Sequence, residues 1–100
     1  AGNVIQKARI TVEPLPDSGE YRAHGPEGVA DFPDLDAAVR FAEERARAEA
    51  ENLVRKAGAD NPEVRVVRQD RTGRSLEGEI LLEVLVTATA AGRPRIGRGV

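Results

Sequence analysis

The 100-residue chain contains no cysteine, methionine or tryptophan, and its aromatic residues are Tyr21, Phe32 and Phe41. The lack of cysteine excludes disulfide bonds and thiolate metal sites. With so few rings the core must be aliphatic, and the aromatic platforms on which single-stranded nucleic acids stack are nearly missing. No apolar run approaches the roughly 18 residues of a membrane span, and nothing resembles a signal peptide. We therefore expect a soluble, cytoplasmic chain with no membrane partner.

The charge is nearly balanced, with 15 basic and 17 acidic residues and a net charge of −2, which argues against a polyanion-binding domain. The length suits a single domain, which we place at residues 1–92, followed by a flexible basic tail at 93–100. The chain begins Ala-Gly-Asn without a methionine, and its first residues already have a strand pattern. We therefore expect a domain excised from a longer protein.

The stretch from Asp34 to Ala57 has the pattern of one amphipathic helix. Its apolar residues recur at steps of three and four: Leu35, Ala38, Val39, Ala42, Ala46, Ala50, Leu53, Val54 and Ala57. Asp34 is a suitable N-cap and Gly58 a suitable C-cap. Because most of the stripe is alanine, the helix can lie close to a partner that supplies the larger side chains. Phe41 falls off the stripe and is expected to lie under a neighbouring loop or to meet another surface.

Strands are predicted by alternation of apolar and polar residues at 4–13, 20–24, 63–70 and 79–90. The last is the strongest and should be central. Residues 29–32 can pair briefly with 20–24 as a small hairpin, and residues 59–62 and 71–75 read as loops. The predicted fold is an α+β domain with a mainly antiparallel four-stranded sheet, covered on one face by one long helix, in the order strand, strand, helix, strand, strand.

The face of this sheet away from the helix should carry Leu81 and Leu85, together with Ile5 and Val67. A fully solvated face shows few such residues, so these four form a candidate interaction surface for a homodimer partner or for a neighbouring domain. Scattered apolar residues are also common on protein surfaces, and this alternative stays open.

No motif for catalysis or cofactor binding is present. His24 is the single histidine, and no pattern names a partner that would orient it. Asp31, Asp34 and Asp36 lack the spacing and the glycine of an EF-hand, and we interpret them as acidic residues that stabilise the start of the helix. The segment Gly25-Pro26-Glu27-Gly28 lacks the lysine of a phosphate loop and reads as a turn. We predict no catalytic, cofactor-binding or metal-binding residue and no enzymatic activity for this chain alone.

An alternative function rests on arginines that are spread through the C-terminal half of the chain. They are Arg65, Arg68, Arg71, Arg74, Arg93, Arg95 and Arg98. Together they could contact phosphates of an anionic ligand or nucleic acid in a free-standing binding module. The net negative charge and the lack of interleaved aromatic residues argue against nucleic acid.

Several segments together resemble the C-terminal region of bacterial hydantoinase/oxoprolinase proteins, of the hydantoin-utilisation protein A or N-methylhydantoinase A type. They are Gly25 to Val29, Asp31 to Ala38, the charged alanine-rich helix, Ala57 to Val64, and Val86 to Arg95. The opening Ala1 to Ile5 is similar to the segment that leads into this region in that family. The resemblance spans nearly the whole chain.

The resemblance implies that the nucleotide site and the opening of cyclic amides belong to an upstream actin-like ATPase core. ATP and metal are thus implied for the parent, and none of the core's signature residues is present here. The predicted function is a non-catalytic C-terminal packing or oligomerisation domain of an ATP-dependent cyclic-amide hydrolase. Its partners would be the upstream domains of the parent or a second copy of the chain.

Overall fold

The computed structural model describes residues 2–95 and folds them into one helix and five strands. The elements are β1 (Val4–Leu15), β2 (Glu20–Gly25), β3 (Gly28–Phe32), α1 (Leu35–Lys56), β4 (Ala59–Arg74) and β5 (Ile80–Pro94). The predicted α+β class is confirmed, but the prediction of four strands is wrong. Residues 28–32 form a complete strand paired with β2 along its length, so three strands precede the helix and two follow it.

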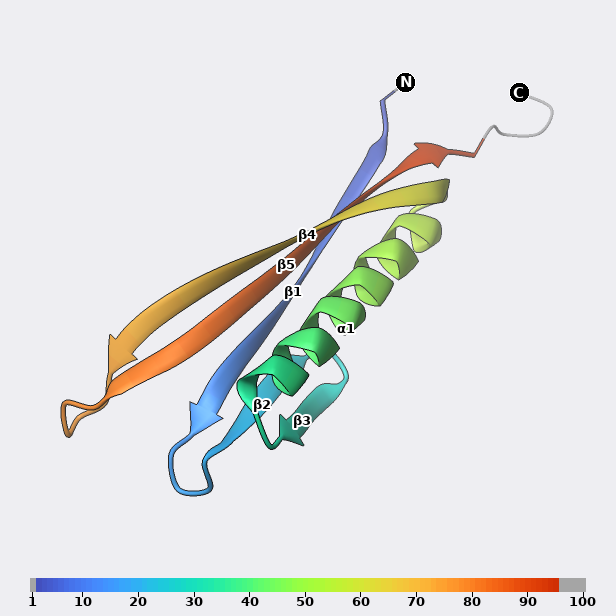
Figure 1. Cartoon of the computed structure of the whole chain (residues 1–100). Coiled ribbons are helices and arrows are strands. Elements are labelled where there is room, and N and C mark those ends of the chain that lie inside the picture. Colours follow the sequence, from blue (N-terminus) through green and yellow to red (C-terminus); the bar gives the residue numbers. More distant parts are fainter. Residues whose placement is uncertain (1, 96–100) are drawn as a thin grey trace.

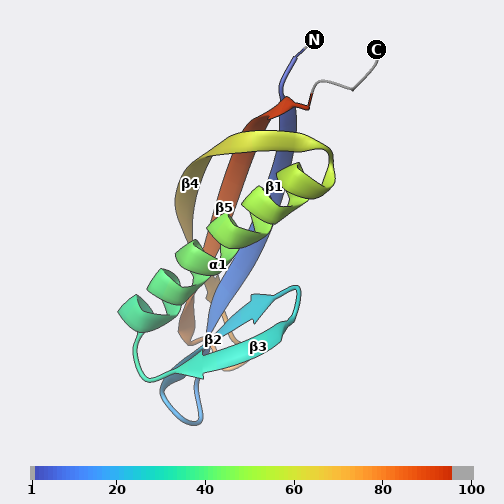
Figure 2. The same ribbon diagram turned by 90° about the vertical axis from the view of Figure 1, so that its right-hand side faces the viewer.

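The strands form one antiparallel sheet in the order β3-β2-β1-β5-β4, and α1 lies across one face (Figures 1 and 2). β5 lies between β1 and β4, so it is an interior strand, but the central strand of the five is β1 rather than β5 as predicted. The β2–β3 hairpin lies beside the N-terminal half of α1 (Figure 1). The opposite face of the sheet is therefore left without a helix in the described chain.

The ends of α1 follow the predicted signals. The Asp34 side chain accepts a hydrogen bond from the backbone N–H of Ala37 at 2.8 Å, as an N-cap does. At the other end Gly58 has a φ of 90°, in the left-handed region that glycine adopts without strain. Ala57 is exposed rather than buried, because the helix ends at Lys56 and the chain turns there into β4.

The core lies between α1 and the sheet and is aliphatic. Fully buried alanines come from both the helix and the sheet, and the largest fully buried side chains are Ile10, Val12, Val54, Val84 and Val86. Four of these five valines and isoleucines come from β1 and β5. The predicted division, with a thin helix stripe against a bulky sheet, is what the structure shows.

β4 is twice as long as its predicted range of 63–70. It begins at Ala59 and runs to Arg74, because the two segments read as loops both pair with β5. A register shift between Asp60 and Glu63, with a φ of 52° at Asn61, accommodates Pro62 within the strand. The reversal of the chain is therefore displaced to residues 75–79.

The C-terminal end of β5 enters the segment that was assigned to the basic tail. Arg93 and Pro94 belong to β5, and the backbone N–H of Arg95 donates to the Gly58 carbonyl at 2.8 Å. The Arg95 guanidinium also pairs with Asp60 at 3.0 Å. Residues 96–100 of the predicted tail, with Arg98, lie outside the described residues.

The molecule is elongated. Its extents are 63 × 19 × 19 Å and its radius of gyration is 16.8 Å, whereas a compact domain of this length has a radius of roughly 13 Å. The elongation comes from the long β4–β5 hairpin, which extends past the helix (Figure 1). Within residues 2–95 no helix combines the length and apolar character needed to cross a membrane.

Candidate interaction surface

The face of the sheet without a helix carries all four residues of the predicted interaction surface. Ile5 is paired with Ala91, Leu85 with Thr11, Val67 with Thr87, and Leu81 with Gly73. All eight residues have odd residue numbers, and alternate residues of a strand share a face. Ile5 and Val67 are more than half exposed, and Leu81 and Leu85 are partly exposed.

These four residues do not form one patch. Leu81 and Ala91 are ten residues apart on β5, which corresponds to roughly 33 Å. Between them the face is polar, with Thr87 and Thr89 on β5 and with Lys7 and Arg65 as neighbours of Thr89 on the flanking strands. The face therefore has separate apolar positions within a mixed surface.

The end of the β4–β5 hairpin extends past the pairing with β1, although Leu82 near its base still packs against the core. Pairing of β5 with β1 ends at Val84, whereas pairing with β4 continues to Ile80. We call residues 71–83 the arm: a two-stranded ribbon without a third strand in the described chain (Figure 1). Such ribbons are marginally stable in water. At its tip Leu76 is fully exposed and Ile80 is two-thirds exposed.

The turn at the tip of the arm is nevertheless well organised. The Ser75 backbone N–H donates to the Glu79 carbonyl at 2.9 Å, and the Ser75 hydroxyl accepts from the Glu79 N–H at 3.1 Å. Arg74 donates to the Gly78 carbonyl at 3.1 Å, and Gly78 has a φ of 84°. Because its polar groups are satisfied internally, the tip presents Leu76 on a defined turn.

The arginines of β4 point to two faces, because they are three residues apart in a strand of period two. Arg65 and Arg71 share the helix-free face with Val67, and Arg68 lies on the helix side with Val66. Arg68 forms a bidentate contact with Asp70 at 2.8 and 3.3 Å. The pKa of its guanidinium is raised, first by this hydrogen bond and also by nearby carboxylates, while burial opposes the shift.

A second cationic group was missed by the sequence analysis. Lys7 and Arg9 of β1 lie on the helix-free face, and β5 separates them from Arg65 of β4, because Lys7 and Arg65 both pair with Thr89 of β5. Lys7, Arg9 and Arg65 form no ion pair within the described part of the chain. Nothing in the sequence joins residues so far apart, because their proximity depends on the pairing of β1 with β5.

His24 has a partner that sequence alone does not name. Its Nε2 lies 2.8 Å from Oε1 of Glu13 on the neighbouring strand β1, and both side chains are partly exposed on the helix-free face. In the next row Arg22 pairs with Asp31 at 2.7 Å. The hydrogen bond from Arg22 holds the pKa of Asp31 below its ordinary value, with burial opposing and the charges of Arg22 and His24 adding to it. Both contacts join neighbouring strands.

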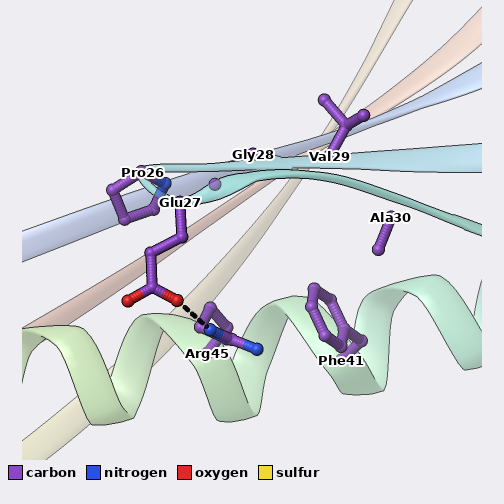
Figure 3. A pocket seen from close by; sticks show the side chains of 8 residues that line it. Pro26, Glu27, Gly28, Val29, Ala30, Phe41 and Arg45 are labelled. Carbon is purple, nitrogen blue, oxygen red and sulfur yellow. Dashed lines mark hydrogen bonds and ion pairs between the residues drawn. The ribbon is translucent and has the colours of Figure 1, made fainter.

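The hollow between the β2–β3 hairpin and α1 is lined by side chains that connect the two elements. Glu27 at the hairpin turn reaches Arg45 of the helix at 2.7 Å (Figure 3). Arg45 also lies 5.1 Å from the centre of the Phe41 ring, and Phe41 lies 4.9 Å from Phe32 of β3. Phe41 thus contacts the hairpin, as expected from its place off the apolar stripe. Since Arg45 is already paired with Glu27, we interpret these contacts as holding the β2–β3 hairpin on the helix.

Among residues 2–95 no group of three or more potential metal ligands is present. Comparisons with protein-family models, with curated proteins and with solved structures find no match to this chain. The geometry of the helix-free face, the arm and the free edge of β4 is therefore what bears on function.

Proposed function

We propose that this chain is a non-catalytic packing or oligomerisation domain that attaches to a larger assembly through its sheet. The observation that carries the proposal is the arm, whose strand edges are unpaired in the described chain and whose tip is apolar and exposed. A ribbon of this kind is poorly stable alone and gains stability when another surface covers it. In this proposal Leu81, Leu85 and Val67 are among the apolar residues of the helix-free face that meet the partner.

The assembly proposed from the resemblance is a hydantoinase/oxoprolinase-like, ATP-dependent cyclic-amide hydrolase, with this chain as its C-terminal domain. In that proposal nucleotide, metal and ring opening belong to the upstream core, and this chain contributes surface. The Glu13–His24 pair is the one arrangement here that resembles acid–base machinery. It is accounted for as a cross-strand contact between partly exposed side chains.

The experiment that tests this proposal is the mass of the native polypeptide in source-cell extract, measured by immunoblot with an antibody against the 100-residue chain. We expect a band several times larger than 10.7 kDa. The same polypeptide, purified by that antibody, should hydrolyse a hydantoin or 5-oxoproline only with ATP. A band near 10.7 kDa, or a large polypeptide without this activity, would overturn the proposed parent.

A second candidate function is a binding module for an anionic ligand, and the unpaired cations Lys7, Arg9 and Arg65 favour it. They share one face of the sheet, where a phosphate-bearing ligand could contact all three. The net charge of −2 and Glu63, which lies opposite Ala91 beside this group, oppose it. Titration with single-stranded RNA at low ionic strength tests it: salt-sensitive binding that is lost in the Arg65→Gln variant would support this function over the first.

A further inference from the structure

The free edge of β4 is long, and from Glu63 to Arg74 it is protected by charged side chains rather than by proline or a bulge. From Glu63 to Arg74 it pairs with β5 without a register shift, and its only proline, Pro62, lies before this stretch. Its outer edge has no strand neighbour within residues 2–95. Twelve residues of strand span roughly 40 Å. Natural sheets protect such edges with prolines, bulges, short strands or charged side chains, because unpaired backbone groups recruit another strand.

The sequence along this edge is complementary to itself. If two copies of β4 align antiparallel about Gln69, then Arg68 of each copy lies opposite the partner's Asp70. Opposite charges directly across two strands stabilise pairing, and like charges oppose it. A shift of the two-fold axis to Arg68 would place two arginines opposite each other, and a shift to Asp70 would place two aspartates opposite each other. Of these three positions, Gln69 is therefore the centre at which the charges match.

The same alignment supplies a neighbour for the arm. With Gln69 at the centre, Thr72 of each arm lies opposite the partner's Val66, and Arg71 lies opposite the partner's Val67. Both valines belong to the part of β4 beside the body of the domain, and Val67 is 53% exposed. Each arm would thus lie along the body of the other copy, where a third strand stabilises the ribbon.

The flank of α1 next to this edge also fits a second copy. Arg40, Glu43, Glu44 and Arg47 line a shallow hollow together with Val66. A two-fold axis perpendicular to the sheet at Gln69 places both helices on the same face, so the partner's arm would run past this mixed-charge flank. Two acids and two bases there can accommodate either sign of a neighbouring side chain.

We propose that two copies of this chain pair through β4, antiparallel and centred on Gln69, to form one continuous sheet with both helices on one face. The occupant of the free edge is thus a second copy of the chain. This inference rests on the proposed packing function and names its partner. The complementary Arg68 and Asp70, together with the uninterrupted edge, carry it.

Charge reversal tests the pairing by sedimentation equilibrium of the purified 100-residue chain at micromolar concentration. The unmodified chain should have twice the mass of 10.7 kDa. In a homodimer of the Arg68→Asp variant, acids lie opposite acids at positions 68 and 70. In a homodimer of the Asp70→Arg variant, bases lie opposite bases at these positions. Each variant should dimerise about tenfold or more weakly. An equimolar mixture of the two should regain the dimer, because every charge then meets its opposite across the interface.

The double variant Arg68→Asp/Asp70→Arg is the matched control, since it restores both the internal pair and the interface pair and should dimerise. A purely internal role for Arg68 and Asp70 predicts no recovery on mixing. Because the chain has no cysteine, Gln69→Cys should form a disulfide-linked dimer under mild oxidation, and Thr72→Cys should do so much more slowly. Circular dichroism confirms that the variants fold.

A monomeric unmodified chain, a mixture that stays monomeric, or equal crosslinking at positions 69 and 72 would overturn this inference. These results would leave the proposed parent standing, because the immunoblot measures a different property. A native band near 10.7 kDa would overturn the parent and leave the β4 dimer to be decided by sedimentation.

Discussion

Gly92 lies where β5 passes the last turn of α1, with no room for a side chain. A Cβ atom built there would lie 2.5 Å from Cγ1 of Val54, 3.0 Å from the Asp60 carbonyl oxygen and 3.2 Å from the Cβ of Ala59. Two of these neighbours are backbone or a Cβ atom, which cannot rotate away. The absence of a side chain at Gly92 thus lets the helix end, β4 and β5 meet.

The variant Gly92→Ala should therefore lose about 1–3 kcal/mol of unfolding free energy, the usual cost of overpacking a core. Urea denaturation followed by circular dichroism measures it. Gly73→Ala on β4 is the matched control, because nothing lies within 4 Å of a Cβ built there. Equal stability of the two variants would show that the contact at Gly92 relaxes without cost.

The ion pair between Arg22 and Asp31 should make the stability of the fold depend on pH. The Arg22 hydrogen bond lowers the pKa of Asp31 in the folded chain, so the pair stabilises the fold fully above the ordinary aspartate pKa of about 3.9. That contribution is lost as the pH falls through the lowered folded value. In Arg22→Gln the carboxyl pKa of Asp31, followed by carbon NMR, should rise. Arg9→Gln should not move it, and an unchanged value in Arg22→Gln would show that the contact does not persist in solution.

At the scale of elements, the alanine stripe of α1 sets how closely the helix lies on the sheet. Ala42, Ala46 and Ala50 have no exposed surface. Ala46→Leu should cost about 1–3 kcal/mol, because the added atoms must push the helix from the sheet. Ala48→Leu, at an exposed position of the same helix, should change stability little. Urea denaturation of the two variants decides it, and similar stabilities would mean that the helix is not held closely.

How much of this fold the sequence predicts depends on whether the signal is local. The helix, its cap at Asp34 and the alternating strands follow from periodicities within a few residues. The full length of β4 does not, because Pro62 and Gly73 are locally strand breakers, and pairing with β5 overrides them. β3 has only five residues, and it is fixed by β2 and by the contact of Phe32 with Phe41.

The candidate surface divides in the same way. Alternation is enough to place Leu81, Leu85, Val67 and Ile5 on one face, but their separation depends on strand register, which comes from long-range pairing. Within the arm, residues 71–75 are predicted as a loop because they are polar or glycine, whereas Ile80 to Glu83 fall within the strand predicted at 79–90. Arg68 and Asp70 matter for the proposed dimer only once β4 is known to be an edge strand, and no local pattern reports that.

At the scale of the whole molecule, stability should vary along the β4–β5 hairpin. Residues 84–90 of β5 lie between two strands and beneath α1, whereas the arm has one neighbour for each of its strands. Amide hydrogens open to exchange through local unfolding, which is cheapest where few buried contacts must break. The hairpin should therefore open from its tip toward the body.

Hydrogen exchange followed by mass spectrometry measures this gradient. In the Arg68→Asp variant, where the proposed dimer is weakened, amides of residues 71–74 and 80–83 should exchange about tenfold or more faster than those of 84–90. In the unmodified chain a β4 dimer should slow exchange in 71–74 and leave 80–83 nearly unchanged, because the first segment gains a partner strand and the second does not. Equal protection along the whole hairpin in the variant would contradict the gradient. Protection of both arm strands in the unmodified chain would indicate that a partner covers the arm on its face rather than along the edge of β4.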